Sequence, residues 1–328
     1  MAVGLVLGAG GVVGGAFHTG VLAAIDEATG WDARSAELIV GTSAGAVMGA
    51  VLRAGLSPAD QFAHALDRPL SAEGRLIAGR LSGLTDLPAG ARLPRVPRPA
   101  SPPMVAASLM SPWPPRPGKA LAGLLPPGTN STEPIGDRIR HLYDGRGWPD
   151  DPLWVCAVRL GDGRRVVFGR DVDDADVGTA VEASLAVPGF MTPVRHGVHS
   201  YVDGGAHSPS NADLLAGLGF DVVVVVSAMS ATWRAGWKAL RPSPTVGNRV
   251  IAGMTLDREV KAIRAAGTPV LVVQPTDSDL AVMGTNWMDR SRRGPVAEQA
   301  KASTLRRLRH PSVVDLVALL PRSRPSWR

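Results

Sequence analysis

The sequence reads Glu37-Leu38-Ile39-Val40-Gly41-Thr42-Ser43-Ala44-Gly45 at the point where a short apolar run meets two glycines. Small and apolar residues fill 44–54, and Gly55 follows them. This pattern predicts a buried strand, a tight turn and a helix ended by glycine. Residues 3–7 and 16–28 repeat the order of strand and helix before it. The alternation predicts a three-layer α/β/α fold with a mainly parallel central sheet.

Residues 41–45 fit the pattern G-x-S-x-G at the predicted junction of strand and helix. A sharp turn there lifts the serine hydroxyl out of the sheet, and the flanking glycines remove side chains that would obstruct it. The N-terminus of the following helix also directs free N–H groups toward the turn. Ser43 is therefore the candidate nucleophile.

A glycine-rich loop occupies residues 8–15, between the first strand and the first helix. Such a loop binds phosphate through backbone N–H groups, or it forms an oxyanion hole. The dinucleotide pattern G-x-G-x-x-G starting at Gly8 would need glycine where Val13 stands. The next strand ends in the serine turn instead of the acidic residue that would bind a ribose. Acyl transfer is favoured, and a nucleotide-binding oxidoreductase is the less favoured interpretation.

Asp203-Gly204-Gly205 follows a short predicted strand over 198–202. An Asp-Gly pair often serves only as a turn. Active sites of open α/β sheets gather at strand ends, however, so an acid there can act together with Ser43. The competing arrangement is a Ser-His-Asp triad completed by His207 or His310.

In combination, these three motifs resemble the patatin-like phospholipase family. Further segments are similar to the family: Phe17–Leu22 to its first helix, and Ala183–Phe190 to the segment before its aspartate. The resemblance implies a Ser43 nucleophile with Asp203 as base. It also implies hydrolysis of lipid carboxylic esters through an acyl-enzyme, without metal or cofactor.

The resemblance further implies an oxyanion hole made by the backbone N–H groups of Gly10, Gly11 and Val12. Many family members carry a basic residue shortly after these glycines, where this chain has Val13 or Gly14. The substitution removes a cation that would steady the loop or meet an anionic headgroup. The same scaffold would also suit a lipid transacylase that uses the same two residues, or an inactive binding protein.

Composition narrows the choice of partners and compartment. The 328 residues carry a net charge of +6 without a recognisable nucleic-acid-binding motif, so we expect no nucleic-acid partner. The only cysteine, Cys156, lies in an apolar run and is expected to be a buried, inert thiol. No basic region precedes the first apolar strand, and no apolar window is long enough to span a membrane. We therefore expect a cytoplasmic protein. The family resemblance implies lipid or phospholipid acyl esters as the substrate and allows peripheral contact with membranes.

Residues 1–328 are expected to form one domain with a proline-rich insertion at about 84–130 and a basic C-terminal region at about 228–328. The insertion holds twelve prolines within 84–128, which predicts a loop without regular helix. A second interpretation of the insertion is a lid whose membrane anchors are Met104, Val105, Leu109, Met110 and Trp113. The C-terminal region is expected to be mostly irregular, apart from a strand over 269–274 and a helix over 312–320. An acidic cluster over 171–176 lacks the spacing of a calcium loop and indicates a solvated turn before a helix. The sequence does not indicate the oligomeric state.

Overall fold

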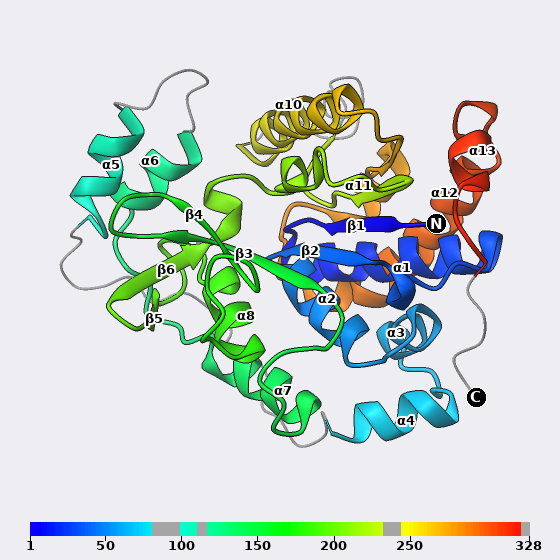
Figure 1. Ribbon diagram of the computed structural model, residues 1–328, viewed down its shortest axis with the longest axis horizontal. Coiled ribbons are helices and arrows are strands. Elements are labelled where there is room, and N and C mark those ends of the chain that lie inside the picture. The colour runs from blue at the N-terminus through cyan, green and yellow to red at the C-terminus, as the bar shows by residue number, and fades with distance from the viewer. Residues whose placement is uncertain (81–98, 110–116, 232–243, 323–328) are drawn as a thin grey trace.

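The computed structural model describes residues 1–80, 99–109, 117–231 and 244–322 (Figure 1). Its centre is an eight-stranded sheet with the order β5-β6-β3-β2-β1-β7-β8, and β4 pairs with β3 beside this path. The strands are β1 (Val3–Leu7), β2 (Leu38–Thr42), β3 (Leu153–Arg159), β4 (Arg165–Phe168), β5 (Val194–His196), β6 (His199–Asp203), β7 (Val222–Val226) and β8 (Val270–Val273).

The middle of the sheet is parallel. β1 lies between β2 and β7, with Leu5 opposite Ile39 on one side and Val224 on the other. β3 continues the parallel part beside β2, whereas β4 and β6 run antiparallel to β3. Parallel strands end at one edge, so the chain after β1, β2 and β7 converges there.

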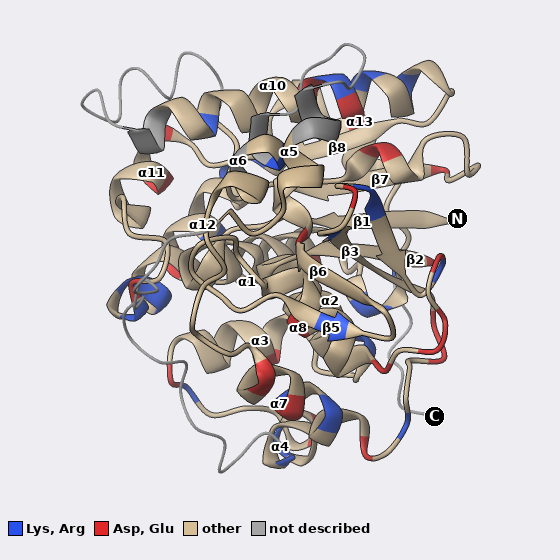
Figure 2. Ribbon diagram, turned by 90° about the vertical axis from the view of Figure 1, so that its left-hand side faces the viewer, with Lys and Arg blue, Asp and Glu red and all other residues tan. Residues whose placement is uncertain are grey.

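Helices cover both faces of the sheet. They are α1 (Gly11–Thr29), α2 (Ala44–Arg53), α3 (Pro58–Ala65), α4 (Ala72–Gly79), α5 (Pro102–Leu109), α6 (Pro117–Leu124), α7 (Glu133–Tyr143), α8 (Val177–Leu185), α10 (Pro244–Ala265), α11 (Asp277–Met283), α12 (Arg293–Leu308) and α13 (Pro311–Ala318). In Figure 2, α10 lies on one side of the strands, and α1, α2 and α8 lie on the other.

Successive residues of β1 feed two separate cores, because side chains alternate across a strand. Leu5 and Leu7 belong to the core beneath α1 and α2, and Val6 belongs to the core beneath α10. All five valines of β7 are buried between these layers. The predicted three-layer α/β/α fold is confirmed.

The C-terminal region is more regular than the sequence suggested. The expected strand and the expected last helix are present as β8 and α13, but the region also contributes the helices α10, α11 and α12, so the expectation of mostly irregular structure was wrong. α12 packs along α1, and a Cβ atom at Gly20 of α1 would collide with the carbonyl oxygen of Ala297. The side chains of α12 that face α1 are small, as at Ala297 and Ala300. The sequence of α12 therefore shows only a weak hydrophobic pattern.

The expectation of a proline-rich segment without helix was also wrong for its described part. α5 begins at Pro102 and α6 at Pro117. Proline fits the first position of a helix because the N–H that it lacks would have no partner within the helix. Met104 is fully buried against Val158 and Val202 of the sheet, so it is not a membrane anchor. The predicted anchors Met110 and Trp113 lie outside the described residues.

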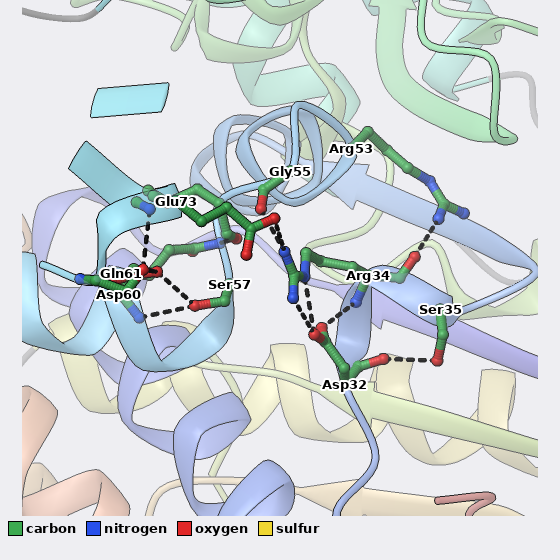
Figure 3. Close-up of polar contacts among 12 residues, drawn as sticks. Asp32, Arg34, Ser35, Arg53, Gly55, Ser57, Asp60, Gln61 and Glu73 are labelled. Carbon is green, nitrogen blue, oxygen red and sulfur yellow. Dashed lines mark hydrogen bonds and ion pairs between the residues drawn. The ribbon is translucent and has the colours of Figure 1, made fainter. Parts of the chain in front are cut away.

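Polar contacts fix α3 and α4 near the start of β2 (Figure 3). The Arg34 guanidinium pairs with Asp32 at 2.6 Å and with Glu73 of α4 at 3.1 Å. Asp60 of α3 accepts hydrogen bonds from the Ser57 hydroxyl and the Ser71 N–H. These contacts hold α3, which forms part of the cavity wall described next.

Candidate active site

Ser43 sits in the turn between β2 and α2 with φ 53° and ψ −118°. A positive φ is strained for a residue with a Cβ atom, and such residues gather at functional sites. The flanking glycines are needed for packing: a Cβ atom at Gly41 would lie 2.6 Å from the Cα of Ala46, and one at Gly45 would collide with the carbonyl of Leu7. The structure therefore contains the strand, tight turn and helix that the sequence predicted around Ser43.

A buried serine holds the backbone of this turn. The Ser43 N–H donates to Ser184 Oγ at 2.8 Å, and that hydroxyl donates to the carbonyl of Cys156 at 2.7 Å. Ser184 lies on α8 and is fully buried. Its role is not predictable from the sequence, because nothing in the helix pattern of α8 distinguishes this serine from an ordinary buried small residue.

Asn211 supports the residue before Ser43. Its Nδ2 donates to Thr42 Oγ1 at 3.1 Å, and its own backbone adopts φ 52°. Glu259 of α10 accepts hydrogen bonds from the Ser210 hydroxyl at 2.5 Å and the Ala212 N–H at 2.9 Å. Hydrogen bonds thus connect Ser43 directly to α8, and Thr42 through the segment around Asn211 to α10. These two helices belong to different layers of the fold.

Asp203 ends β6 and lies opposite Ala157 of β3. Its Oδ1 accepts the Gly205 N–H at 2.7 Å, and its side chain is buried, with 5% of the residue exposed. Burial raises the pKa of Asp203 to about 6, against the opposing effect of hydrogen bonds from the Gly205 N–H and the Ser43 side chain. A Cβ atom at Gly204 would collide with the Cys156 carbonyl, so this glycine is required where the chain leaves the sheet.

The glycine-rich loop between β1 and α1 is anchored at both ends. Gly8 N–H donates to Val226 O at 3.0 Å, and Val13 N–H donates to Trp287 O at 3.0 Å. Gly11 has φ 61°, and a Cβ atom there would lie 2.8 Å from Trp287 O. The first N–H groups of a helix have no partner within it, so the start of α1 offers donors at the residues that precede Val13.

Ser43, Asp203 and the loop residues Gly10, Gly11 and Val12 all line one cavity of about 1410 Å³. Its apolar wall includes Val47, Met48, Val51, Leu56 and Leu66. Its charged lining comprises Arg68, Arg138, Arg290, Arg293, Asp67 and Glu298, besides Asp203. The structure therefore brings together every residue that the sequence assigned to the site.

The histidines are placed differently. Among the residues that line the cavity in the described chain, His64 is the only histidine. His310 is exposed and caps α13, and His207 follows the short helical turn after Asp203 without lining the cavity. His18 is buried in α1, where desolvation lowers its pKa to about 4.

The acidic cluster before α8 is structural. Asp171 accepts the Val167 N–H, and Asp176 caps α8, as a turn before a helix would require. Within the described ranges, no three acidic, histidine or cysteine side chains are grouped as metal ligands. Over those residues, no helix has the length and apolar character needed to cross a bilayer.

Comparison with known proteins gives one family, and the similar solved structures include the two that follow. A family model described as patatin-like phospholipase matches residues 5–216. The crystal structure of VipD from Legionella pneumophila is similar at 12% identity and a TM-score of 0.41, covering 93% of this chain and 66% of that one. The type III effector protein ExoU is similar at 18% identity and a TM-score of 0.36, covering 94% of this chain and 53% of that one. The chain thus spans about two thirds and about half of the length of these two proteins.

Proposed function

Since the chain belongs to the patatin-like phospholipase family, we propose that it hydrolyses carboxylic esters of lipids through an acyl-enzyme on Ser43, with Asp203 as the base. Membership of the family implies a lipid-hydrolysing enzyme. One observation carries the residue assignment: the strained Ser43 and the buried Asp203, which contact each other through the serine side chain, face the same cavity.

The proposed reaction needs no histidine. Ser43 Oγ attacks the ester carbonyl carbon while its proton passes to Asp203, which gives a tetrahedral oxyanion. The oxyanion collapses, the C–O bond breaks, and the alcohol leaves with the proton from Asp203. Water then attacks the acyl-enzyme while Asp203 takes its proton, which gives a second tetrahedral oxyanion. This collapses with cleavage of the bond to Ser43 Oγ, which regains its proton from Asp203 as the carboxylic acid leaves. A pKa of about 6 makes Asp203 a stronger base than an ordinary aspartate and leaves it ionised at pH 7.

The start of α1 is the proposed oxyanion hole. Gly10, Gly11 and Val12 line the cavity with Ser43, and the N-terminus of a helix attracts negative charge. Val13 already donates its N–H to Trp287 O, so it does not join them.

The proposed substrate is a phospholipid or lysophospholipid. A volume of about 1410 Å³ exceeds the roughly 300–1,000 Å³ of ordinary small-molecule sites and leaves room for a long acyl chain. The apolar wall from α2 and α3 suits that chain, and the four arginines of the cavity suit an anionic headgroup. Val187 and Met288 line the cavity while 41% and 37% exposed, which supports peripheral contact of the cavity mouth with a bilayer. A cytoplasmic location is part of the same proposal.

The same proposal treats residues 1–328 as one domain. β8 extends the central sheet from the C-terminal region, and α12 of that region packs on α1. These contacts support a single unit in which the C-terminal region helps to build the site.

Labelling with a fluorophosphonate probe tests the assignment, together with hydrolysis of p-nitrophenyl esters and phospholipid vesicles. We expect Ser43→Ala to abolish labelling and Asp203→Asn to abolish hydrolysis. The exposed Ser278→Ala serves as the matched control and should behave as the wild type. Full activity in Asp203→Asn would contradict the dyad.

Two further variants separate the dyad from a triad. His207→Ala and His310→Ala are expected to remain active, because neither histidine lines the cavity. Loss of activity in either that matches the loss in Asp203→Asn would favour the triad. Product analysis with an added alcohol acceptor distinguishes hydrolysis from transacylation. Saturable NADPH binding without labelling of Ser43 would point to an oxidoreductase instead.

A further inference from the structure

Arg249 of α10 is a buried cation, and no buried anion lies beside it among the residues that the structure describes. Only 1% of the residue is exposed, and none of the described acidic residues forms an ion pair with it. Burial alone lowers its pKa to about 10, so the guanidinium stays charged at pH 7. Holding an uncompensated charge in the interior is costly, and an apolar side chain would meet a purely structural role at a lower cost.

Two groups hold the guanidinium. Its Nη1 donates to the carbonyl of Ala228 at 2.8 Å. Its central carbon lies 4.1 Å from the centre of the Trp287 ring, which is a cation–π arrangement.

Both of these groups also touch the glycine-rich loop. A Cβ atom at Gly10 would lie 3.1 Å from the Ala228 methyl, so Ala228 packs directly on the loop. The Trp287 carbonyl accepts the Val13 N–H at 3.0 Å. Ala228 and Trp287 therefore each contact both the Arg249 guanidinium and the loop that carries the proposed oxyanion donors.

We propose that Arg249 is a positioning residue that fixes the glycine-rich loop through Ala228 and Trp287 and lends it a positive charge for the oxyanion. This inference rests on the proposed function, because it needs a negative intermediate at that loop. The loop over residues 8–15 has no charged side chain of its own, and Arg249 of α10 supplies a positive charge behind Ala228 and Trp287, on which the loop packs. The missing counter-charge of Arg249 is then the transient oxyanion, which a preorganised site stabilises without reorganisation.

Arg249→Gln and Arg249→Lys test the charge separately from the packing. Glutamine can still donate to Ala228 O but is neutral, whereas lysine keeps the charge. Arg258→Gln removes one charge from the exposed face of the same helix and is the matched control. For each variant, kcat and KM for a soluble ester, the Ki of a trifluoromethyl ketone and the Tm are measured. The ketone forms a tetrahedral adduct with a nucleophilic serine and so reports on the oxyanion hole.

We expect Arg249→Gln to lower kcat and to weaken ketone binding by roughly 10-fold each with KM little changed, less than the loss of a direct oxyanion donor. Arg249→Lys should recover most of both, and Arg258→Gln should match the wild type. A folded Arg249→Gln with wild-type kcat and Ki would overturn the inference, as would equal losses in the two Arg249 variants. If the wild type shows no Ser43-dependent hydrolysis, the proposed function falls and the inference falls with it. If Arg249→Gln does not fold, a wild-type Tm with roughly 10-fold lower kcat in Arg249→Lys would also overturn it.

Discussion

Replacing Asp203 by asparagine is expected to stabilise the folded protein while it removes activity. The pKa of Asp203 is raised from 3.8 to about 6 because the carboxylate is desolvated. Above pH 6 the group is ionised in both states, and the folded state alone bears the cost of burying the charge. A shift of about two units corresponds to about 3 kcal/mol, which is the upper limit of the gain. Asparagine keeps an oxygen to accept the Gly205 N–H and has no charge to bury.

The effect depends on pH in a direction that can be checked. A folded-state pKa above the unfolded value means that the folded protein binds more protons between pH 3.8 and about 6. The contribution of Asp203 to stability therefore falls as pH rises through this window. Urea unfolding at pH 4, 5, 6 and 8 should show Asp203→Asn and wild type alike at pH 4 and diverging by up to about 3 kcal/mol at pH 8. The exposed Asp257→Asn is the control. A difference that is constant with pH, or a less stable variant at pH 8, would refute the reasoning.

Three other outcomes follow from the structure. The kcat/KM of the wild type should fall below about pH 6, as protonation of Asp203 removes the base; an acidic limb near pH 4, the ordinary value of an aspartate, would contradict this. Ser184→Ala leaves the buried Ser43 N–H without an acceptor, so stability should fall by about 1–3 kcal/mol and kcat should fall, as denaturation and kinetics would show. In α1, Gly20→Ala should be poorly folded because its methyl group would collide with a carbonyl of α12. Gly15→Ala has open space around the methyl group, so its free energy of unfolding should rise by about 0.5–1 kcal/mol. Similar Tm values for the two variants would be inconsistent with this packing.

The parallel sheet was predictable because its signals are local. The valines of 222–226 and the apolar run over 38–40 are too short and too apolar for anything but buried strands. The turn at Ser43 was predictable for the same reason. Its glycines are required because the backbone a few residues away, and that of the neighbouring β1, leaves no room for a Cβ atom. The Asp-Gly pair at Asp203 is typical of a plain turn, so it does not identify a site residue by itself. Only its combination with the serine turn elsewhere in the chain indicates a role for Asp203.

What the sequence did not reveal depends on contacts between distant residues. Arg249 and Trp287 have no shared motif, and their pairing appears only when α10 and the segment before α12 meet the glycine-rich loop. α12 hides its buried face because small residues, rather than large apolar ones, allow its close approach to α1. The helices α5 and α6 are not predictable from the sequence pattern, because a high density of proline disfavours helix even though the first turn of a helix accepts proline.

The order of the strands has a consequence for how the protein is made. β1, which begins the glycine-rich loop, pairs with β7 more than two hundred residues later, and Trp287 fixes the loop later still. During synthesis the serine turn therefore leaves the ribosome long before the segments that complete its surroundings. Such distant pairings slow folding, because the intervening chain must be closed into a loop first. The nascent chain consequently carries the serine turn before Trp287 can fix the glycine-rich loop. Under the proposed function, we expect hydrolytic activity only after the segment around Trp287 has been added.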